Sequence, residues 1–328
     1  MKRIIYWSWI FILILTACGP LAPQGAQSSF ATESTSVESI VRDTEVPDDP
    51  ATARPSETQI QPPTQIPATE TNVPTATMVM TETPDTRLLP EKWQEWPIVP
   101  EPTSRVYEIY VLGQELGNDP HHFSKIGDCH SVRAAFMGLF DIPGWYKLRE
   151  GREHLQSSID WFTGSFDRDG MGVKGGYNAA AVLSPLWADP QICEPGENPV
   201  ECEVRTWEPS FAIISLEVWW EGRTPEGFEK YMRTIIDYLI EHGVVPILAT
   251  KADNVEGNHA LNLTTAKLAY EYNIPLWNFW RAAQELPNKG MDAERNDKFH
   301  ISTLAWTTRS FTALETLDRM WESVNAVQ

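Results

Sequence analysis

The stretch Phe211-Ala212-Ile213-Ile214-Ser215-Leu216 decides the fold of this chain of 328 residues. A continuous apolar run of this length is typical of a parallel strand that is covered on both faces. Three further short runs, at residues 123–127, 244–249 and 274–277, also read as strands. The proline in the last run, Pro275, indicates a strand end, because proline cannot donate to a sheet ladder.

Helical patterns separate these runs. Phe228, Ile235 and Leu239 recur at helical spacing behind Thr224-Pro225, a typical helix start. Two further stripes of this kind lie within residues 261–272 and 311–321. Strands that alternate with helices predict an α/β fold, with a doubly wound parallel sheet and helices on both faces.

The first 17 residues have the features of an export signal. Lys2 and Arg3 precede an apolar run that is too short to be interpreted first as a spanning helix. The run ends in Leu15-Thr16-Ala17-Cys18, which matches a bacterial lipobox. We expect cleavage before Cys18 and acylation of its thiol, which would anchor the protein to membrane lipid on the outer face of the cell membrane. An uncleaved signal anchor with an incidental cysteine is the alternative.

Residues 18–86 have the composition of a disordered stalk. They are rich in Thr, Pro, Ser and Glu, and Phe30 is their only aromatic residue. Such a segment cannot bury enough apolar surface to offset the entropy of ordering it. The whole chain has a net charge of −19, which argues against a nucleic-acid partner. Residues 87–328, where tryptophans and apolar runs appear, are long enough for one sizeable domain.

The four cysteines fit an oxidising compartment. Cys193 and Cys202 flank a loop of turn-forming residues, and their spacing predicts a disulfide. A free pair, or half of a metal site, is the alternative. With Cys18 lipidated, Cys129 is left alone, as either an inert buried residue or a reactive thiol.

Two motifs carry the chemistry. Gly127-Asp128-Cys129 follows the first predicted strand, and Asp297-Lys298-Phe299-His300 lies near the C-terminus. Together on an α/β sheet they resemble the SGNH, or GDSL, hydrolases, a flavodoxin-like family in which Gly-Asp-Ser follows the first strand and Asp-x-x-His comes near the end. The resemblance covers most of residues 105–322 and implies an ester hydrolase.

Carried over by position, Cys129 takes the place of the nucleophilic serine, His300 that of the base, and Asp297 that of the carboxylate that orients it. An imidazole within reach of a thiol can deprotonate it, and the carboxylate fixes the histidine tautomer. A turn that ends a strand, with Cys129 as a small buried residue, is the simpler interpretation of the first motif.

The oxyanion donors depart from the family pattern. The Gly-x-Asn-Asp block aligns with Glu217-Val218-Trp219-Trp220, so Trp219 stands where the family has its donor asparagine. Losing one such donor can remove about 2.7–4 kcal/mol of transition-state stabilisation. Gly175 or Gly176 is the candidate for a second, backbone donor. Glu217 is either a new acid–base group or a salt-bridged side chain.

The remaining candidates concern the ligand. Asp128, Lys251 and Asn254 follow strand ends, so we expect them to contact substrate. The 14 tryptophans favour an acylated glycan, because exposed rings stack on sugars. The sequence predicts no cofactor and no metal, and the pair His121-His122 reads as a loop. An ester hydrolase and an inactive relative that binds glycan or another envelope component remain the two functional hypotheses.

Overall fold

The computed structural model describes residues 87–217 and 224–326, which belong to a unit that spans residues 80–328. The predicted signal, the lipidation site Cys18, the stalk and Trp219 lie outside the described residues. In the part of the chain that the structure describes, no helix is both long and apolar enough to cross a membrane.

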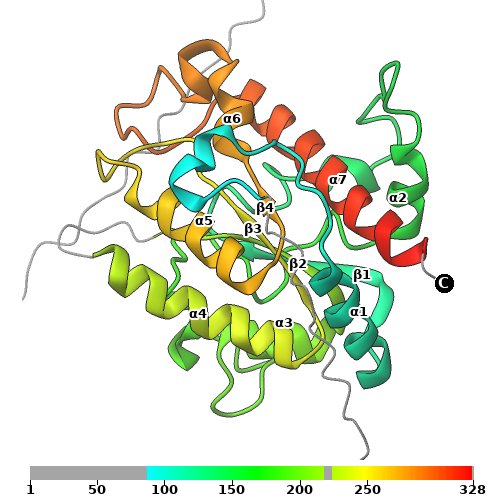
Figure 1. Ribbon diagram of the computed structural model, residues 1–328. Coiled ribbons are helices and arrows are strands. Elements are labelled where there is room, and N and C mark those ends of the chain that lie inside the picture. Colours follow the sequence, from blue (N-terminus) through cyan, green and yellow to red (C-terminus); the bar gives the residue numbers. More distant parts are fainter. Residues whose placement is uncertain (1–86, 218–223, 327–328) are drawn as a thin grey trace, which may run out of the picture. The chain divides into compact units, whose positions relative to one another are not determined.

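A four-stranded parallel sheet forms the centre of the domain (Figure 1). Its strands lie in chain order and are β1 (Asp119–Gly127), β2 (Pro209–Ser215), β3 (Val245–Ala249) and β4 (Leu276–Trp277). Six of the seven residues of β2 and four of the five of β3 are buried, as their continuous apolar sequences require. The predicted α/β fold with a parallel sheet is confirmed.

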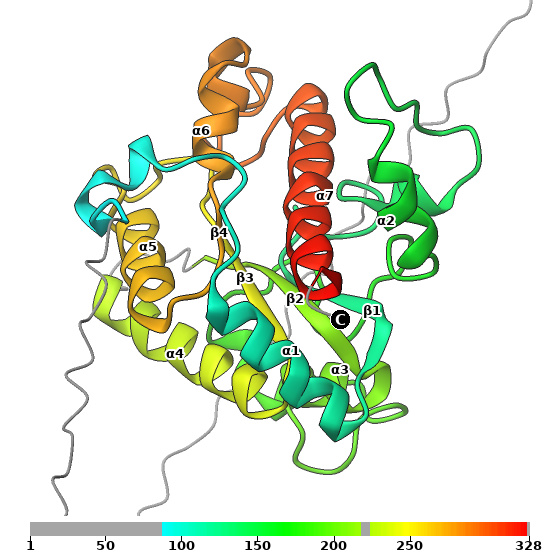
Figure 2. The ribbon, with the colours of Figure 1, turned by 45° about the vertical axis from the view of Figure 1, so that its right-hand side comes forward.

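Helices cover both faces of this sheet (Figure 2). The connection from β1 to β2 contains α2 (Leu155–Trp161) and α3 (Pro199–Trp207), and the next two connections contain α4 (Pro225–Glu241) and α5 (Ala260–Tyr272). Connections between neighbouring parallel strands are right-handed. Because these strands lie in chain order, that rule places successive connections on the same face of the sheet. The remaining described α-helices are α1 (Ser104–Leu116), α6 (Phe279–Gln284) and α7 (Thr303–Asn325). Helix α1 contacts β2, β3 and α7, while α2 and α6 pack on α7.

The predicted helix starts are formed by local capping. The Thr224 hydroxyl accepts the backbone N–H of Gly227 at 3.2 Å at the start of α4, with proline at the first helical position. The stripe with Phe228, Ile235 and Leu239 is buried, each residue being at most 1% exposed. The amphipathic pattern therefore directed this helix onto the sheet.

One sequence prediction on this domain is wrong. His121 and His122 lie inside β1 and not in a loop. The two rings stack on Trp161 and Trp207 at centroid distances of 4.0 and 3.9 Å. Aromatic packing therefore supports an edge strand whose sequence is too polar to be recognised as one.

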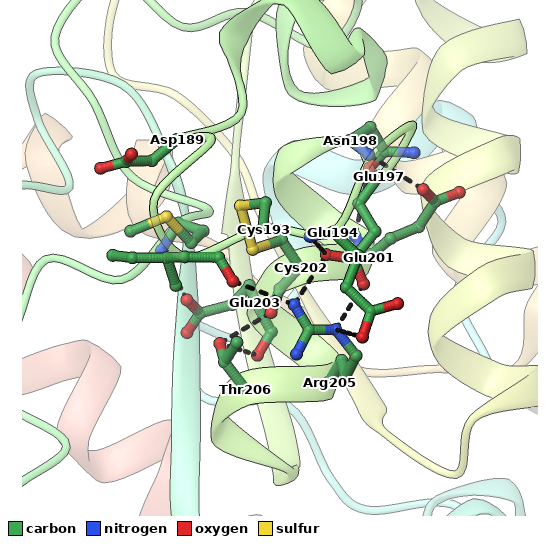
Figure 3. Close-up of a disulfide and its surroundings, with 12 residues drawn as sticks. Asp189, Cys193, Glu194, Glu197, Asn198, Glu201, Cys202, Glu203, Arg205 and Thr206 are labelled. Atoms are coloured by element: carbon green, nitrogen blue, oxygen red, sulfur yellow. Dashed lines mark hydrogen bonds and ion pairs between the residues drawn. A yellow bond between two sulfur atoms is a disulfide. The ribbon is translucent and has the colours of Figure 1, made fainter.

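Cys193 and Cys202 form a disulfide at the start of α3 (Figure 3). Asn198 caps this helix by accepting the backbone N–H groups of Val200 at 2.9 Å and Glu201 at 3.1 Å. The bridge therefore joins the first turns of α3 to the loop before it, as the spacing predicts.

Candidate active site

The carboxyl edge of the sheet brings together loops that are far apart in the sequence. β1 and β2 end in register, and β3 ends beside β2. The loops that follow these strands carry Cys129, Glu217 and Lys251. Ligand sites in open parallel sheets lie at this edge, so the predicted site residues occupy the expected place.

His300 links Asp297 to Cys129. The His300 Nε2 lies 3.7 Å from the Cys129 Sγ, and its Nδ1 lies 2.7 Å from an Asp297 carboxylate oxygen. The other Asp297 oxygen accepts the backbone N–H groups of His300 at 3.0 Å and Phe299 at 2.9 Å. These backbone hydrogen bonds hold the pKa of Asp297 well below its usual range. An ionised carboxylate on Nδ1 favours the tautomer that leaves Nε2 free to accept a proton.

A closed loop holds His300 in this position. Met291 and Ile301 form an antiparallel bridge at the base of the loop, and the Asp292 N–H donates to the His300 carbonyl at 2.9 Å. Immediately afterwards Ser302 caps the first turn of α7. The imidazole is therefore carried by a segment that is fixed at both ends.

The turn after β1 requires glycine at position 127. A Cβ on Gly127 would lie 2.1 Å from the hydroxyl oxygen of Ser131, which is far inside contact distance. The Asp128 carboxylate accepts the His130 backbone N–H at 2.8 Å, so it closes the turn locally. Cys129 lies between Asp128 and His130 in this turn, and its side chain is half-buried.

A second glycine-containing loop runs beside this turn. The Lys174 N–H donates to the Gly127 carbonyl at 3.2 Å. A Cβ on Gly175 would lie 3.9 Å from the Cβ of Cys129, so this glycine borders the thiol. Gly176 has φ of 89°, a left-handed conformation that favours glycine. Both glycines remain predicted backbone donors for an oxyanion.

Buried charges surround Lys251. Its Nζ lies 2.6 Å from Asp253, 2.7 Å from Glu256 and 3.3 Å from Glu217. Burial opposes the charged form of Lys251, but these three carboxylates overcome it and raise the lysine pKa. Burial, with the negative charge of Asp253, raises the pKa of Glu217 well above its usual range. Glu217 therefore lies in the buried cluster around Lys251, and both its acid–base role and the contact of Lys251 with substrate remain predictions.

The same surroundings oppose a thiolate. Burial, followed by the negative charge of Asp128, raises the pKa of Cys129 to about 11, and Glu217 acts in the same direction. Burial also raises the pKa of Asp128 to about 6. The thiol therefore carries its proton at neutral pH and needs His300 as a base in any nucleophilic reaction.

The sequence interpretation missed Arg309 and His130. Arg309 is 2% exposed, donates from Nη1 to the His130 carbonyl at 2.6 Å, and places its guanidinium 4.0 Å from the centroid of the Phe136 ring. His130 is 8% exposed, and burial lowers its pKa to about 3. An arginine on a helix gives no sequence signal of burial, because such residues usually face solvent. Arg309 fixes the backbone directly after Cys129.

A cavity of about 590 Å³ lies on one side of the loop that carries Asp297. Its lining combines one tryptophan with polar and charged side chains, including Trp280, Asn254, Asp253, Lys289, Arg295 and Lys298. The predicted ligand contact Asn254 thus faces a space large enough for a small ligand.

One domain contains the parallel sheet, the turn after β1 and the Asp-x-x-His loop. The turn and the loop meet through Cys129 and His300. The turn and the loop are the features in which the chain resembles the SGNH hydrolases. No family model matches the sequence, and a search of curated proteins finds no match.

Two solved structures are similar to the chain. One is described as a lipolytic protein of the G-D-S-L family from Desulfitobacterium hafniense DCB-2, with 14% identity, a TM-score of 0.40, and coverage of 60% of this chain and 98% of the other. The second is the acetyl xylan esterase AlAXEase, with 17% identity, a TM-score of 0.39, and coverage of 62% of this chain and 99% of the other.

Proposed function

We propose that the chain is an exported, lipid-anchored ester hydrolase that uses Cys129, His300 and Asp297. The supporting observation is the position of His300, with Asp297 at 2.7 Å from Nδ1 and the Cys129 sulfur at 3.7 Å from Nε2. That arrangement is the nucleophile, base and orienting group of acyl transfer.

The proposed reaction has two halves. His300 Nε2 accepts the thiol proton while the Cys129 sulfur attacks the acyl carbon, and the negative charge moves to the carbonyl oxygen. The alcohol leaves with the proton from His300, and an acyl thioester remains on Cys129. His300 then takes a proton from water, the resulting hydroxide attacks the thioester, and the carboxylic acid leaves while the thiol is reprotonated.

An acylated glycan is the proposed substrate class. The cavity beside the Asp297 loop is lined by Trp280 and Asn254, which suit a sugar ring through stacking and hydrogen bonding. Anchoring through Cys18 would hold the enzyme at the membrane surface, where envelope glycans lie.

Hydrolysis of p-nitrophenyl acetate by the full chain tests this proposal. We expect activity that is lost in Cys129→Ala and in His300→Ala, and retained in Asp160→Asn, a surface carboxylate on α2. Activity that survives in Cys129→Ala would overturn the proposal.

One observation favours a second candidate function. The raised pKa of Cys129, about 11, is what an unused thiol near buried carboxylates would show. A binding protein that keeps the cleft without the reaction would bind acetylated xylo-oligosaccharides, show no esterase activity, and bind equally well as Cys129→Ala. Calorimetric titration of both proteins with those oligosaccharides separates the two candidates.

A further inference from the structure

His130 is a buried histidine with an unused ring nitrogen. Its side chain is packed against the Phe299 ring at a centroid distance of 4.5 Å. Its Nε2 finds no hydrogen-bond partner among the described residues. A buried polar atom without a partner is unfavourable, so a ligand for this nitrogen would stabilise the site.

Two other ligand atoms lie beside His130. The Cys129 sulfur, one ring nitrogen of His130 and one ring nitrogen of His300 are all within 4.8 Å of one another. In a tetrahedral zinc site, Zn–S of about 2.3 Å and Zn–N of about 2.0–2.1 Å place sulfur and nitrogen about 3.6 Å apart. The Cys129 Sγ and His300 Nε2 are 3.7 Å apart, so this pair already has that separation.

Two carboxylates beside these ligand atoms favour a cation, while the buried Arg309 guanidinium opposes one. Asp297 accepts from the far nitrogen of His300 at 2.7 Å, the arrangement that orients histidine ligands in zinc proteins. Asp128 adds a buried carboxylate next to Cys129 in the chain. Thiol and imidazole ligands select zinc-like metals over Mg²⁺ and Ca²⁺, which prefer oxygen.

We propose that Cys129, His130 and His300 form a binding site for one Zn²⁺ ion, with a fourth position open to water. Binding displaces the thiol proton to solvent and forms the Zn–S bond, so the metal occupies the atoms that thiol chemistry would use. Metal binding and alkylation of Cys129 therefore exclude each other. The inference does not rest on the proposed hydrolase, since it needs only the three ligand atoms.

Cobalt titration of the full chain carrying Cys18→Ser tests the site, because that background leaves Cys129 as the only thiol outside the disulfide. We expect one Co²⁺ per chain, with the visible bands of tetrahedral cobalt and a thiolate-to-cobalt band in the near ultraviolet, all removed by one equivalent of Zn²⁺. Absence of the thiolate band would overturn the proposal.

Ligand variants and a matched control sharpen the test. Loss of a ligand should weaken Co²⁺ binding by at least about tenfold in His130→Phe, which keeps a ring against Phe299, and in His300→Ala. Protein alkylated at Cys129 should not bind, whereas His154→Ala, a surface histidine, should bind as the parent does. Unchanged affinity in both His130→Phe and His300→Ala would refute the site.

Esterase assays in chelator are run on the same samples. Hydrolysis without cobalt binding refutes the metal site alone, and cobalt binding without hydrolysis refutes the hydrolase alone.

Discussion

Neutralising Asp128 should make Cys129 more reactive. The Cys129 pKa is raised from 9.0 to about 11, by burial first and by the Asp128 charge second. Asp128→Asn removes that charge and keeps the side-chain oxygen that accepts the His130 N–H at 2.8 Å. The turn should therefore survive while the thiolate becomes easier to form.

The magnitude follows from the titration. Well below its pKa, the thiolate fraction changes tenfold for each unit of pKa. If Asp128 supplies up to about one unit of the rise, Asp128→Asn should alkylate up to about tenfold faster at pH 8.5. In the parent, the rate should keep rising with pH until about 11, because the thiolate is the reacting species.

Peptide-resolved mass spectrometry after timed iodoacetamide treatment measures this rate at Cys129 itself. The control is Asp160→Asn, which should react as the parent does. An unchanged rate in folded Asp128→Asn, or a parent rate that levels off near pH 8.5, would refute the electrostatic explanation.

Three further predictions concern stability and anchoring. Burial lowers the pKa of Lys125 from 10.5 to about 8. Between pH 8 and pH 10.5 the unfolded state therefore binds more protons than the folded state. The free energy of unfolding should rise with pH across this interval. Lys125→Met, which loses a hydrogen bond to the Phe166 carbonyl at 2.8 Å, should raise that free energy at pH 7 by about 2 kcal/mol and flatten its pH dependence in urea titrations. Lower stability in Lys125→Met at pH 7 would contradict this. Replacing Cys193 and Cys202 together by serine should lower the free energy of unfolding by about 2.7 kcal/mol, measured in urea beside the parent, and no change would remove the bridge as a stabilising element. Metabolic labelling with a fatty acid should be lost in Cys18→Ser, and persistent labelling of that variant would refute the lipobox interpretation.

The sequence was informative where local patterns carry the signal. The apolar run that became β2 predicted a buried parallel strand because strands covered on both faces lack polar alternation. Cys129 and His300 could be predicted to meet, although they are 171 residues apart, because strand-end loops converge at one edge.

Other features could not be predicted because they depend on tertiary packing. The buried Arg309 and the three carboxylates around Lys251 are charged residues that local sequence places on the surface. His121 and His122 lie in a strand that their polarity conceals. The unpartnered nitrogen of His130 becomes visible only once its neighbours are in place.

Parallel measurement of labelling and activity tests the central claim most directly. The parent chain is treated with iodoacetamide, and each sample is split between the p-nitrophenyl acetate assay and peptide mass spectrometry of Cys129. The account predicts that the fraction of activity lost in the parent equals the fraction of Cys129 alkylated, and that Cys129 is alkylated more slowly in His300→Ala. Full alkylation of Cys129 that leaves hydrolysis intact would contradict it.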